Sequence, residues 1–417
     1  MNATTVVVAL ALIASPVRAV AQAQPGSQDR HMEIAKRVLS STPLFDGHND
    51  LPWAIRENPE APRDVIAYDL RSRAPGHTDL ARLREGMVGA QFWSVYIPSA
   101  SVAEGAAKTQ LEQIDIAKQI FALYPDVFEE TLTPEAALRA FRAGKVASVM
   151  GMEGGHAIEN SLGALRAFFG MGARYMTLTH STNIDWADSG TDTAAHDGLT
   201  EFGKEVVREM NRLGMLVDLS HTSPATMHDV LDVAEAPVIF SHSSARALVE
   251  HGRNVPDDVL RRLTENGGVV MVTFVPGFIN AAVRDWQALP EAERSRTPEP
   301  RATLADVADH IEHVRRTAGV DHVGIGSDFD GISSVPVGLE DVSTFPALFA
   351  ELSQRGWSEE DLRKLAGENV LRVWRQAESV ARRLQRERPP STATIEQLDG
   401  PAARTAHGEP VPSSPGS

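Results

Sequence analysis

Short runs of apolar residues alternate along the chain with longer segments in which apolar residues recur every three or four positions. The short runs are rich in Val, Ile, Phe and Met and have the length of buried β-strands. The longer segments, such as residues 107–123 and 200–213, have the period of helices that bury one face. The runs that we predict to be strands are residues 43–49, 88–97, 146–152, 174–180, 215–221, 237–242, 268–275 and 322–328.

This order of elements predicts an α/β fold. Strands separated by helices pair in parallel through right-handed crossovers, and eight such strands close a (β/α)8 TIM barrel. Thr133 and Ser223 each precede a proline, a pattern typical of a helix N-cap followed by the first turn. An open, doubly wound sheet is the alternative. It normally has a glycine-rich phosphate turn after the first strand, and residues 45–53 (FDGHNDLPW) do not form one.

The two ends of the chain differ from the segment between them. Residues 1–23 contain a short apolar run followed by small residues, which predicts a secretory signal peptide cleaved near Ala21 or Ala23. Residues 386–417 are rich in Pro, Ser, Thr, Ala and Gly without periodic apolar positions, which predicts a disordered tail. The barrel domain is therefore expected within residues 31–385, where no stretch is apolar and long enough to cross a bilayer.

Composition excludes several classes of function. The 417 residues carry a formal net charge of −16, which argues against binding to nucleic acid or to an anionic membrane surface. The chain has no cysteine, so disulfides, thiolate metal sites and cysteine nucleophiles are excluded. Any bound metal ion would therefore be held by histidine and carboxylate side chains.

Residues that can bind a metal or carry a proton lie at the predicted strand ends, where a TIM barrel places its chemistry. They are His48 and Asp50 after the first strand, Glu153 after the third, His180, His221 and His242 at the ends of the fourth, fifth and sixth, and Asp328 at the end of the eighth. His48 and Asp50 are two positions apart, so on a strand they would point to one face. Polar groups that face an interior together need a partner there, such as a metal ion.

Each of these residues also has a structural interpretation. His221 can lie beside a helix N-cap, and His242 can be a hydrogen-bonded residue in a strand-to-helix turn. Glu153 can be an exposed loop acid, and Asp328 can belong to a turn, as we expect for Asp330. A single His-x-Asp pair is more often structural than catalytic. The coincidence of the whole set with the strand ends favours a functional site.

Three histidines and two carboxylates at four strand ends are enough to bind two divalent metal ions, with one carboxylate bridging them. Ligands without sulfur suit zinc, and manganese, iron or cobalt also fit. A pair of ions about 3.5–4 Å apart can lower the pKa of water toward roughly 7 and so provide a nucleophile for a carbonyl or phosphoryl centre. The reaction also needs a proton carrier, which Asp328 suits, and a donor to the developing oxyanion, which His180 suits.

Seven motifs follow one another along the chain: FDGHNDLPW, EGGHAI, RYMTLTHSTN, DLSHTS, FSHSSAR, RNVPDDVL and GSDFDG. In this order they resemble the membrane dipeptidase (renal dipeptidase) family of the amidohydrolase superfamily. The resemblance covers roughly residues 40–375 and includes the later stretches GLEDVSTFP and ENVLRVW. It implies a TIM barrel of the metallo-dependent hydrolase type with dipeptidase activity.

The resemblance also implies which side chains bind the metal ions. His48 and Asp50 would bind one zinc ion, and His221 and His242 would bind the second. Glu153 would bridge the two ions, in place of the carboxylated lysine that other members of the superfamily use. No lysine lies at a predicted strand end in this chain.

Three further residues receive roles from the same resemblance. His180 would contact the substrate and stabilise the tetrahedral intermediate, and Asp328 would transfer a proton to the leaving amine. Arg253, in RNVPDDVL, would bind the C-terminal carboxylate of the substrate, for which a guanidinium offers two parallel hydrogen bonds. Without the resemblance, Arg253 would be interpreted as a surface residue paired with Asp257 or Asp258.

The chain departs from the animal enzymes of this family in two ways. Without cysteine it cannot form their disulfides, including the one that links their dimer, so a homodimer would be held without a disulfide. Its tail has no hydrophobic segment to direct a lipid anchor. Both features indicate a bacterial relative exported to the periplasm. Residues 181–198 and 276–302 follow the fourth and seventh strands and would shape the side-chain subsites.

The leading hypothesis is a binuclear zinc dipeptidase. The resemblance implies tolerance of a D-residue at the C-terminal position and hydrolysis of β-lactam rings as further expectations. A second hypothesis is a metal-dependent amidohydrolase, lactonase or esterase that acts on another small substrate, for which Arg253 would be dispensable. A third is a metal-binding scaffold without catalysis, against which the complete set of candidate residues argues.

Overall fold

The computed structural model describes residues 27–401, and the strands in this part form one parallel sheet. The strands are β1 (Leu44–Asn49), β2 (Val88–Ser94), β3 (Phe128–Glu130), β4 (Val146–Glu153), β5 (Ala173–Thr177), β6 (Leu216–Asp218), β7 (Ile239–Phe240), β8 (Val269–Val272) and β9 (Val323–Ile325). Their order is β2-β1-β9-β8-β7-β6-β5-β4-β3, and a further pairing between β2 and β4 closes eight of them into a ring. The predicted (β/α)8 barrel is confirmed.

All eight predicted strands are present, and the structure adds β3. This strand lies outside the ring and pairs only with the first residues of β4, where Phe128 is opposite Val146. The last residues of β4 pair instead with β5, where Glu153 is opposite Thr177. The sequence pattern missed β3 because three residues are too few to show a period.

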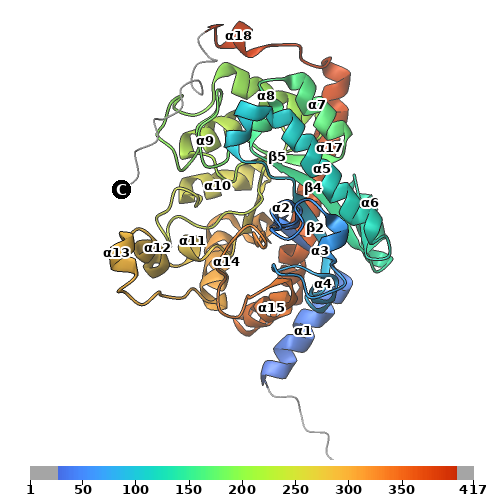
Figure 1. Ribbon diagram of the computed structural model, residues 1–417, viewed down its shortest axis with the longest axis vertical. Coiled ribbons are helices and arrows are strands. Elements are labelled where there is room, and N and C mark those ends of the chain that lie inside the picture. Colours follow the sequence, from blue (N-terminus) through green and yellow to red (C-terminus); the bar gives the residue numbers. More distant parts are fainter. Residues whose placement is uncertain (1–26, 402–417) are drawn as a thin grey trace, which may run out of the picture.

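Helices surround the barrel, as Figure 1 shows. The α-helices are α1 (Ser27–Ser41), α2 (Leu51–Arg56), α3 (Val65–Tyr68), α4 (Leu80–Glu85), α5 (Ala106–Leu123), α6 (Pro134–Arg142), α7 (Leu162–Gly170), α8 (Glu201–Leu213), α9 (Pro224–Val233), α10 (Asp257–Asn266), α11 (Pro276–Ile279), α12 (Ala281–Gln287), α13 (Glu291–Arg294), α14 (Leu304–Ala318), α15 (Phe345–Gln354), α16 (Glu359–Arg363), α17 (Asn369–Glu387) and α18 (Ile395–Leu398). The predicted helices at 107–123 and 200–213 are α5 and α8. The predicted caps are present as well, because Thr133 and Ser223 accept hydrogen bonds from the first turns of α6 and α9.

Aromatic side chains fill the lower part of the barrel and lead up to its functional end. Trp374 of α17 contacts Phe45 and Phe92 at ring-centroid distances of 6.4 and 6.2 Å. Phe92 contacts Tyr175 at 5.1 Å, and the hydroxyl of Tyr175 lies 2.8 Å from Nδ1 of His48. The interior is therefore a packed core rather than a channel, as in other barrels of this size.

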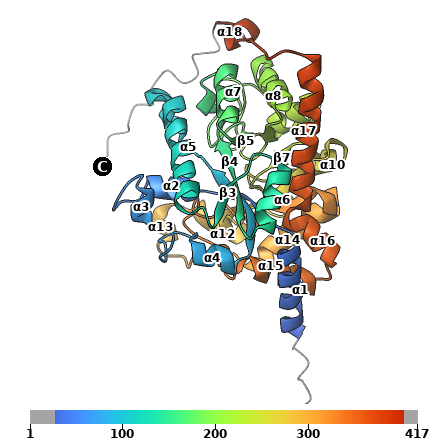
Figure 2. The same cartoon turned by 90° about the vertical axis from the view of Figure 1, so that its right-hand side faces the viewer.

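The two predicted terminal segments are only partly described. Residues 1–23 and 402–417 lie outside the described part of the chain. Residues 388–401, which the sequence assigned to a disordered tail, pack against the body of the protein near α7 and α8 (Figure 2). Ile395 is buried there, and the carboxylate of Asp399 accepts hydrogen bonds from Thr200 and from the amide of Phe202. None of the helices within residues 27–401 is both long and apolar enough to span a bilayer.

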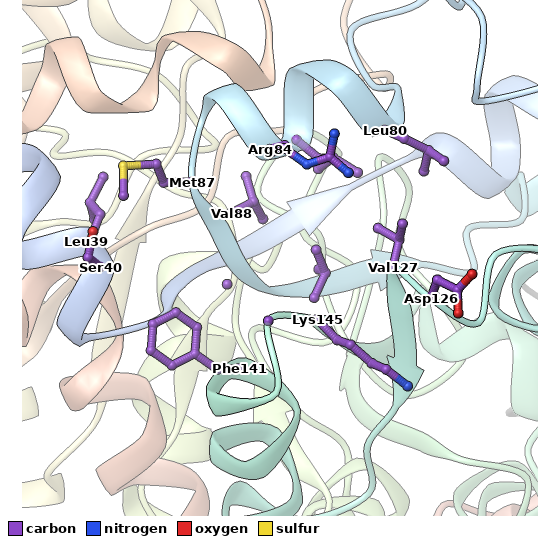
Figure 3. Close-up of a pocket in the computed structure, with 14 residues that line it drawn as sticks. Leu39, Ser40, Leu80, Arg84, Met87, Val88, Asp126, Val127, Phe141 and Lys145 are labelled. Atoms are coloured by element: carbon purple, nitrogen blue, oxygen red, sulfur yellow. The ribbon is translucent and has the colours of Figure 1, made fainter.

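A cavity of about 270 Å³ opens at the starting ends of β2 and β4. Figure 3 shows it between Val88, Phe141, Arg84 and Lys145. It contains none of the predicted site residues, which all follow the opposite ends of the strands. In TIM barrels the starting end supports stability and the carboxyl end carries the chemistry. We therefore expect the functional site at the carboxyl ends of the strands.

Candidate metal centre at the carboxyl ends of the strands

His48 lies within β1 and Glu153 is the last residue of β4, whereas the other predicted site residues follow the strands. β6 ends at Asp218 and β9 ends at Ile325, each three residues before the expected end at His221 or Asp328. Asp50 is already the N-cap residue of α2. The short strands leave the following backbone free to turn inward over the barrel, and this brings the side chains together.

Glu153 lies at the centre of the site, with its two carboxylate oxygens facing different histidines. Oε2 lies 3.4 Å from Nε2 of His48. Oε1 lies 3.0 Å from Nε2 of His221 and 3.3 Å from Nε2 of His242. The side chain therefore stands between two groups of potential ligands, which is the arrangement that a bridging carboxylate requires.

Each of these two groups contains a close pair of potential ligand atoms. Nε2 of His48 lies 3.2 Å from Oδ2 of Asp50, and the Nε2 atoms of His221 and His242 are 3.0 Å apart. Ligands about 2.0–2.1 Å from a tetrahedral zinc ion are about 3.3 Å from one another, so both spacings fit a shared metal ion. All four residues are buried.

Unpartnered polar atoms support the same conclusion. Nε2 of His48 and Oδ1 of Asp50 are buried and have no hydrogen-bond partner among the described residues. Buried polar atoms are normally satisfied, and two unsatisfied ones at one point indicate a missing partner. Imidazole nitrogens and carboxylate oxygens without sulfur are a donor set for zinc or a similar divalent ion. The residues present therefore fit a metal centre.

The protonation states of His221, His242 and Glu153 suit metal binding. Burial lowers the pKa of His221 and of His242 well below the usual value, which keeps both rings neutral and their nitrogens able to coordinate. Although burial alone would raise the pKa of Glu153, the imidazoles around it hold that pKa well below its usual range. The carboxylate is thus ionised.

Hydrogen bonds at Nδ1 orient two of the histidine rings. Nδ1 of His48 lies 2.8 Å from the hydroxyl of Tyr175, and Nδ1 of His242 lies 2.8 Å from Oγ of Ser241. Such partners fix the ring orientation and direct the other nitrogen toward the metal. Gly151 makes room for Tyr175, because a Cβ there would lie 2.0 Å from its ring. Sequence reasoning found neither Tyr175 nor Ser241, since nothing in the local pattern marks them.

Two buried carboxylates that the sequence analysis passed over lie below the site. Asp46 and Asp218 are fully buried in β1 and β6. Burial raises the pKa of Asp46 to about 6 against the hydrogen bonds that it accepts. The available signal was an aspartate inside an apolar strand, two residues before His48 and three before His221.

Arg253 is buried at the rim of the site and not on the surface. Its Nη2 donates to the carbonyl of His242 at 3.2 Å, and its guanidinium lies 5.3 Å from the ring centre of Phe278. Within residues 27–401 no carboxylate lies within 4.0 Å of it, and the alternative ion pair with Asp257 or Asp258 is wrong. Burial lowers its pKa to about 10, so the group remains charged at neutral pH. A buried, charged guanidinium without a carboxylate is ready to bind an anion.

His180 lies at the opening of the site. Its ring is 4.4 Å from that of His221 and 4.8 Å from that of Tyr96, and its Nε2 lies 3.8 Å from Oε1 of Glu153. Its side chain is 20% exposed, unlike the buried potential ligands. Burial nevertheless lowers its pKa, so it is a neutral ring with one N–H to donate.

Asp328 lies beside the first pair. Potential ligand atoms of His48, Asp50 and Asp328 lie within 4.8 Å of one another. Burial raises the pKa of Asp328 well above its usual value. Its backbone has a φ of 69°, as does that of His221. Left-handed backbone at residues other than glycine is uncommon and is concentrated at functional sites.

Asp330, which the sequence assigned to a turn, has ordinary partners, and so does His156. Asp330 accepts a hydrogen bond from the amide of His77 at 2.6 Å, and His156 contacts the carbonyl of Ile97. The loop at 181–198 lies at the same end of the barrel as the site and lines a cavity of about 690 Å³ together with residues 99–103. The loop at 276–302 contributes Phe278 next to Arg253.

Comparison with known proteins agrees with this geometry. Residues 32–388 match the model of the family described as membrane dipeptidase (peptidase family M19). The probable dipeptidase PvdM from Pseudomonas aeruginosa is 25% identical with a TM-score of 0.74, and the match covers 85% of this chain and all of that one. A metallo peptidase from Rhodobacter sphaeroides, liganded with a phosphinate mimic of the dipeptide L-Ala-D-Ala, is 28% identical with a TM-score of 0.70, covering 81% and 99%.

A third solved structure, dipeptidase AC, is 29% identical with a TM-score of 0.71, and the match covers 81% of this chain and 98% of that one. The family match extends over the whole barrel and includes every residue of the candidate metal centre. The chain therefore belongs to the membrane dipeptidase family, peptidase family M19, as a metallo-dipeptidase.

Proposed function

We propose that this protein hydrolyses the amide bond of dipeptides at a centre that binds two zinc ions. The observation that carries the proposal is the position of Glu153, whose two oxygens face two separate pairs of buried potential ligands. His48 and Asp50 would hold one ion, His221 and His242 the other, and Glu153 both. When bound, such a pair of ions supplies the Lewis acidity that lowers the pKa of water toward neutrality.

Arg253 selects the substrate in this proposal. Its buried guanidinium binds the C-terminal carboxylate of the dipeptide, which takes the place of the missing anionic partner. Phe278 lies against the guanidinium and limits the access of water, which strengthens the contact. A free carboxylate next to the cleaved amide distinguishes this bond from an internal amide of a longer peptide and from a simple ester or lactone.

In this proposal Asp328 transfers protons, and His180 stabilises the charge that develops on the substrate oxygen. Asp328 lies next to His48 and Asp50, takes a proton from the attacking water and returns it to the leaving amine. His180, at the opening, donates its N–H to the oxygen of the tetrahedral intermediate. Tolerance of a D-residue at the C-terminal position is part of the proposal, supported by the dipeptide mimic in the Rhodobacter sphaeroides structure.

Further parts of the proposal come from the sequence. Residues 31–385 form the dipeptidase domain, residues 1–23 direct export to the periplasm, and a homodimer, held without a disulfide, is the proposed assembly. Hydrolysis of β-lactam rings is included as an activity of the same site.

The test combines metal analysis with a substrate panel. Purified protein should contain two equivalents of zinc and should hydrolyse L,L and L,D dipeptides with a free C-terminus. An Asp328→Asn variant should keep both equivalents and lose turnover. One metal equivalent or none would contradict the binuclear centre. Turnover of esters or lactones in the absence of any dipeptide hydrolysis would contradict the substrate assignment.

A further inference from the structure

Asp46 and Asp218 occupy matching places below the two halves of the metal centre. Asp46 lies in β1, two residues before His48 on the same strand, and Asp218 is the last residue of β6, three residues before His221. Both are fully buried. Neither has a Lys, Arg or His partner within 4.0 Å in the described part of the chain. The direct polar contacts of both carboxylates are therefore hydrogen bonds from neutral groups.

The carboxylate of Asp46 joins β1 to the loop after β9. Oδ1 accepts the amide of Ser327 at 2.7 Å and that of His48 at 3.5 Å. Oδ2 accepts the hydroxyl of Ser327 at 2.6 Å and the side-chain amide of Gln91, on the neighbouring strand β2, at 3.0 Å. Ser327 is thus held by both its amide and its hydroxyl.

The carboxylate of Asp218 repeats this pattern between β6 and the loop after β7. Oδ1 accepts the amide of Ser241 at 2.8 Å and that of Ser220 at 3.1 Å. Oδ2 accepts the hydroxyl of Ser241 at 2.5 Å and that of Thr177, on the neighbouring strand β5, at 2.5 Å. Each aspartate therefore binds a serine that follows one neighbouring strand, a polar side chain on the other neighbouring strand, and the amide two residues further along its own chain.

We call each carboxylate together with the hydrogen bonds that it accepts a clamp. The serines bound in the two clamps come directly before site residues. Ser327 precedes Asp328, Ser241 precedes His242, and Ser220 precedes His221. Because the hydroxyl of Ser241 donates to Asp218, it is left to accept a hydrogen bond from Nδ1 of His242. This directs Nε2 of that ring into the centre.

The residues that follow two of the bound serines have strained backbone. Asp328 and His221 have φ values of 69°, a conformation that costs roughly 1–3 kcal/mol in residues other than glycine and persists only where the surroundings hold it. Both follow a serine whose amide is bound by one of the two carboxylates. The clamps hold the strained turns in place.

We propose that Asp46 and Asp218 are positioning residues, each of which sets the geometry of one half of the metal centre. Asp46 positions His48 and Asp328, on the side of the first ion, and Asp218 positions His221 and His242, on the side of the second. The inference rests on the proposed binuclear centre and adds a division of labour between the two aspartates.

Asparagine substitutions test whether each aspartate affects only one ion, because they keep the shape of the side chain. All the groups around each carboxylate donate hydrogen bonds, so the new NH2 group would face donors and break the clamp. Asp218→Asn should weaken one zinc equivalent by roughly 10–100-fold and leave the other within twofold. Asp46→Asn should do the same to the other equivalent. Zinc affinity is measured by competition with a chromophoric chelator, independently of turnover.

Variants that lack one ligand show which ion is affected. In a His242→Ala background, Asp46→Asn should weaken the remaining zinc by roughly 10–100-fold, whereas Asp218→Asn should change it less than twofold. In a His48→Ala background the two effects should be exchanged. Glu209→Gln is the control, since it removes a buried carboxylate on α8 that contacts Arg166 and Arg212 and no site residue. It should leave both affinities unchanged.

The outcomes separate this inference from the proposed function. Wild-type protein that binds fewer than two zinc ions would overturn the binuclear centre itself. Wild-type protein with two ions, together with aspartate variants that weaken both ions alike or neither, would overturn only the positioning roles. If an asparagine variant fails to fold, Ser327→Ala and Ser241→Ala carry the same test. They remove the hydroxyl and keep the amide bond, and each should weaken one ion selectively.

Discussion

Gly331 lies against the two carboxylates on the first side of the metal centre. A Cβ at this position would lie 2.2 Å from Oδ2 of Asp50 and 2.7 Å from Oδ1 of Asp328. Both distances are too short for real contacts, so one carboxylate would have to move. Gly331→Ala should therefore cost at least tenfold in affinity for one zinc ion and most of the turnover, as measured by chelator competition and dipeptide hydrolysis.

The control for this substitution is a glycine with space around it. A methyl group added at Gly170, the last residue of α7, would meet no atom of the described residues within 4 Å. Gly170→Ala should leave zinc affinity and turnover unchanged and should stabilise the protein slightly, because alanine lowers the entropy of the unfolded chain. Normal zinc binding in Gly331→Ala would show that the carboxylates tolerate displacement.

Arg253 supports a prediction about substrate charge. Arg253→Lys keeps the positive charge but loses the paired hydrogen bonds, and Arg253→Ala loses both. We expect kcat/KM for dipeptides to fall by about 10–100-fold in the lysine variant and further in the alanine variant, mainly through KM. The matched substrate is the same dipeptide with a C-terminal amide. The variants should hydrolyse this amide as slowly as the wild type does, and a larger effect on the amide would contradict the assignment.

At the scale of elements, helix α14 connects two of the loops that surround the site. Its buried His310 accepts the amide of Ala245, after β7, through Nδ1 at 3.0 Å. It contacts the carbonyl of Ile279, at the end of α11, through Nε2 at 3.2 Å. One nitrogen accepts and the other donates, so this role requires the neutral ring.

Protonation of His310 should make the protein sensitive to acid. Burial lowers its pKa to about 4, so between pH 6.5 and 4 the unfolded chain binds a proton that the folded protein does not. The stability that the neutral ring contributes is complete above pH 6.5 and is lost as the pH falls toward 4. Urea unfolding at pH 7 and pH 5 should show a loss of about 2 kcal/mol from this group. His310→Gln should be less sensitive to acid by that amount, and an equal dependence in both proteins would contradict the prediction.

Element boundaries show where tertiary contacts overrule the local pattern. Residues 388–401 have the composition of a tail, yet Ile395 is buried and Asp399 bonds to the first turn of α8. One buried apolar residue, one carboxylate and the hydrogen bonds of Arg388 and Ser391 attach the segment, and none of them produces a period. The same reason explains why β3, with three residues, escaped prediction.

At the scale of the whole molecule, we expect the barrel and the proposed metal centre to stabilise one another. The candidate ligands lie within or just after β1, β4, β6 and β7, so bound ions would tie together strands that are far apart in the sequence. Ligands that bind only the folded state add stability by mass action. The aromatic column from Trp374 to Tyr175 ends at His48, so the core also supports the centre from below.

Metal removal should therefore lower the free energy of unfolding. At free zinc roughly a thousand times Kd, each ion contributes about 4 kcal/mol, and chelation should remove that contribution. We expect a lower Tm after dialysis against a chelator and full recovery when zinc is restored. Glu153→Gln should show a much smaller difference between the two conditions, since it lacks the bridging ligand. A wild-type Tm that does not respond to the chelator would contradict structural coupling.

The sequence was sufficient to predict the number and order of the barrel strands, and the candidate ligands that it indicated lie together at one end of the barrel. Buried parallel strands are marked by apolar runs, and a polar side chain at the end of such a run stands out against them, as His221 and Asp328 do. The chemistry of these residue types, without cysteine, restricted the site to a metal held by nitrogen and oxygen.

Only the tertiary structure decided how these residues meet. It placed Glu153 between two pairs of potential ligands, buried Arg253 with no carboxylate of the described residues within 4.0 Å, and put Asp46 and Asp218 beneath the two halves of the candidate centre. The physical reason is that hydrogen bonds and burial depend on distances between strands that are remote in sequence. A local pattern records which face a residue occupies and not which partner it finds there.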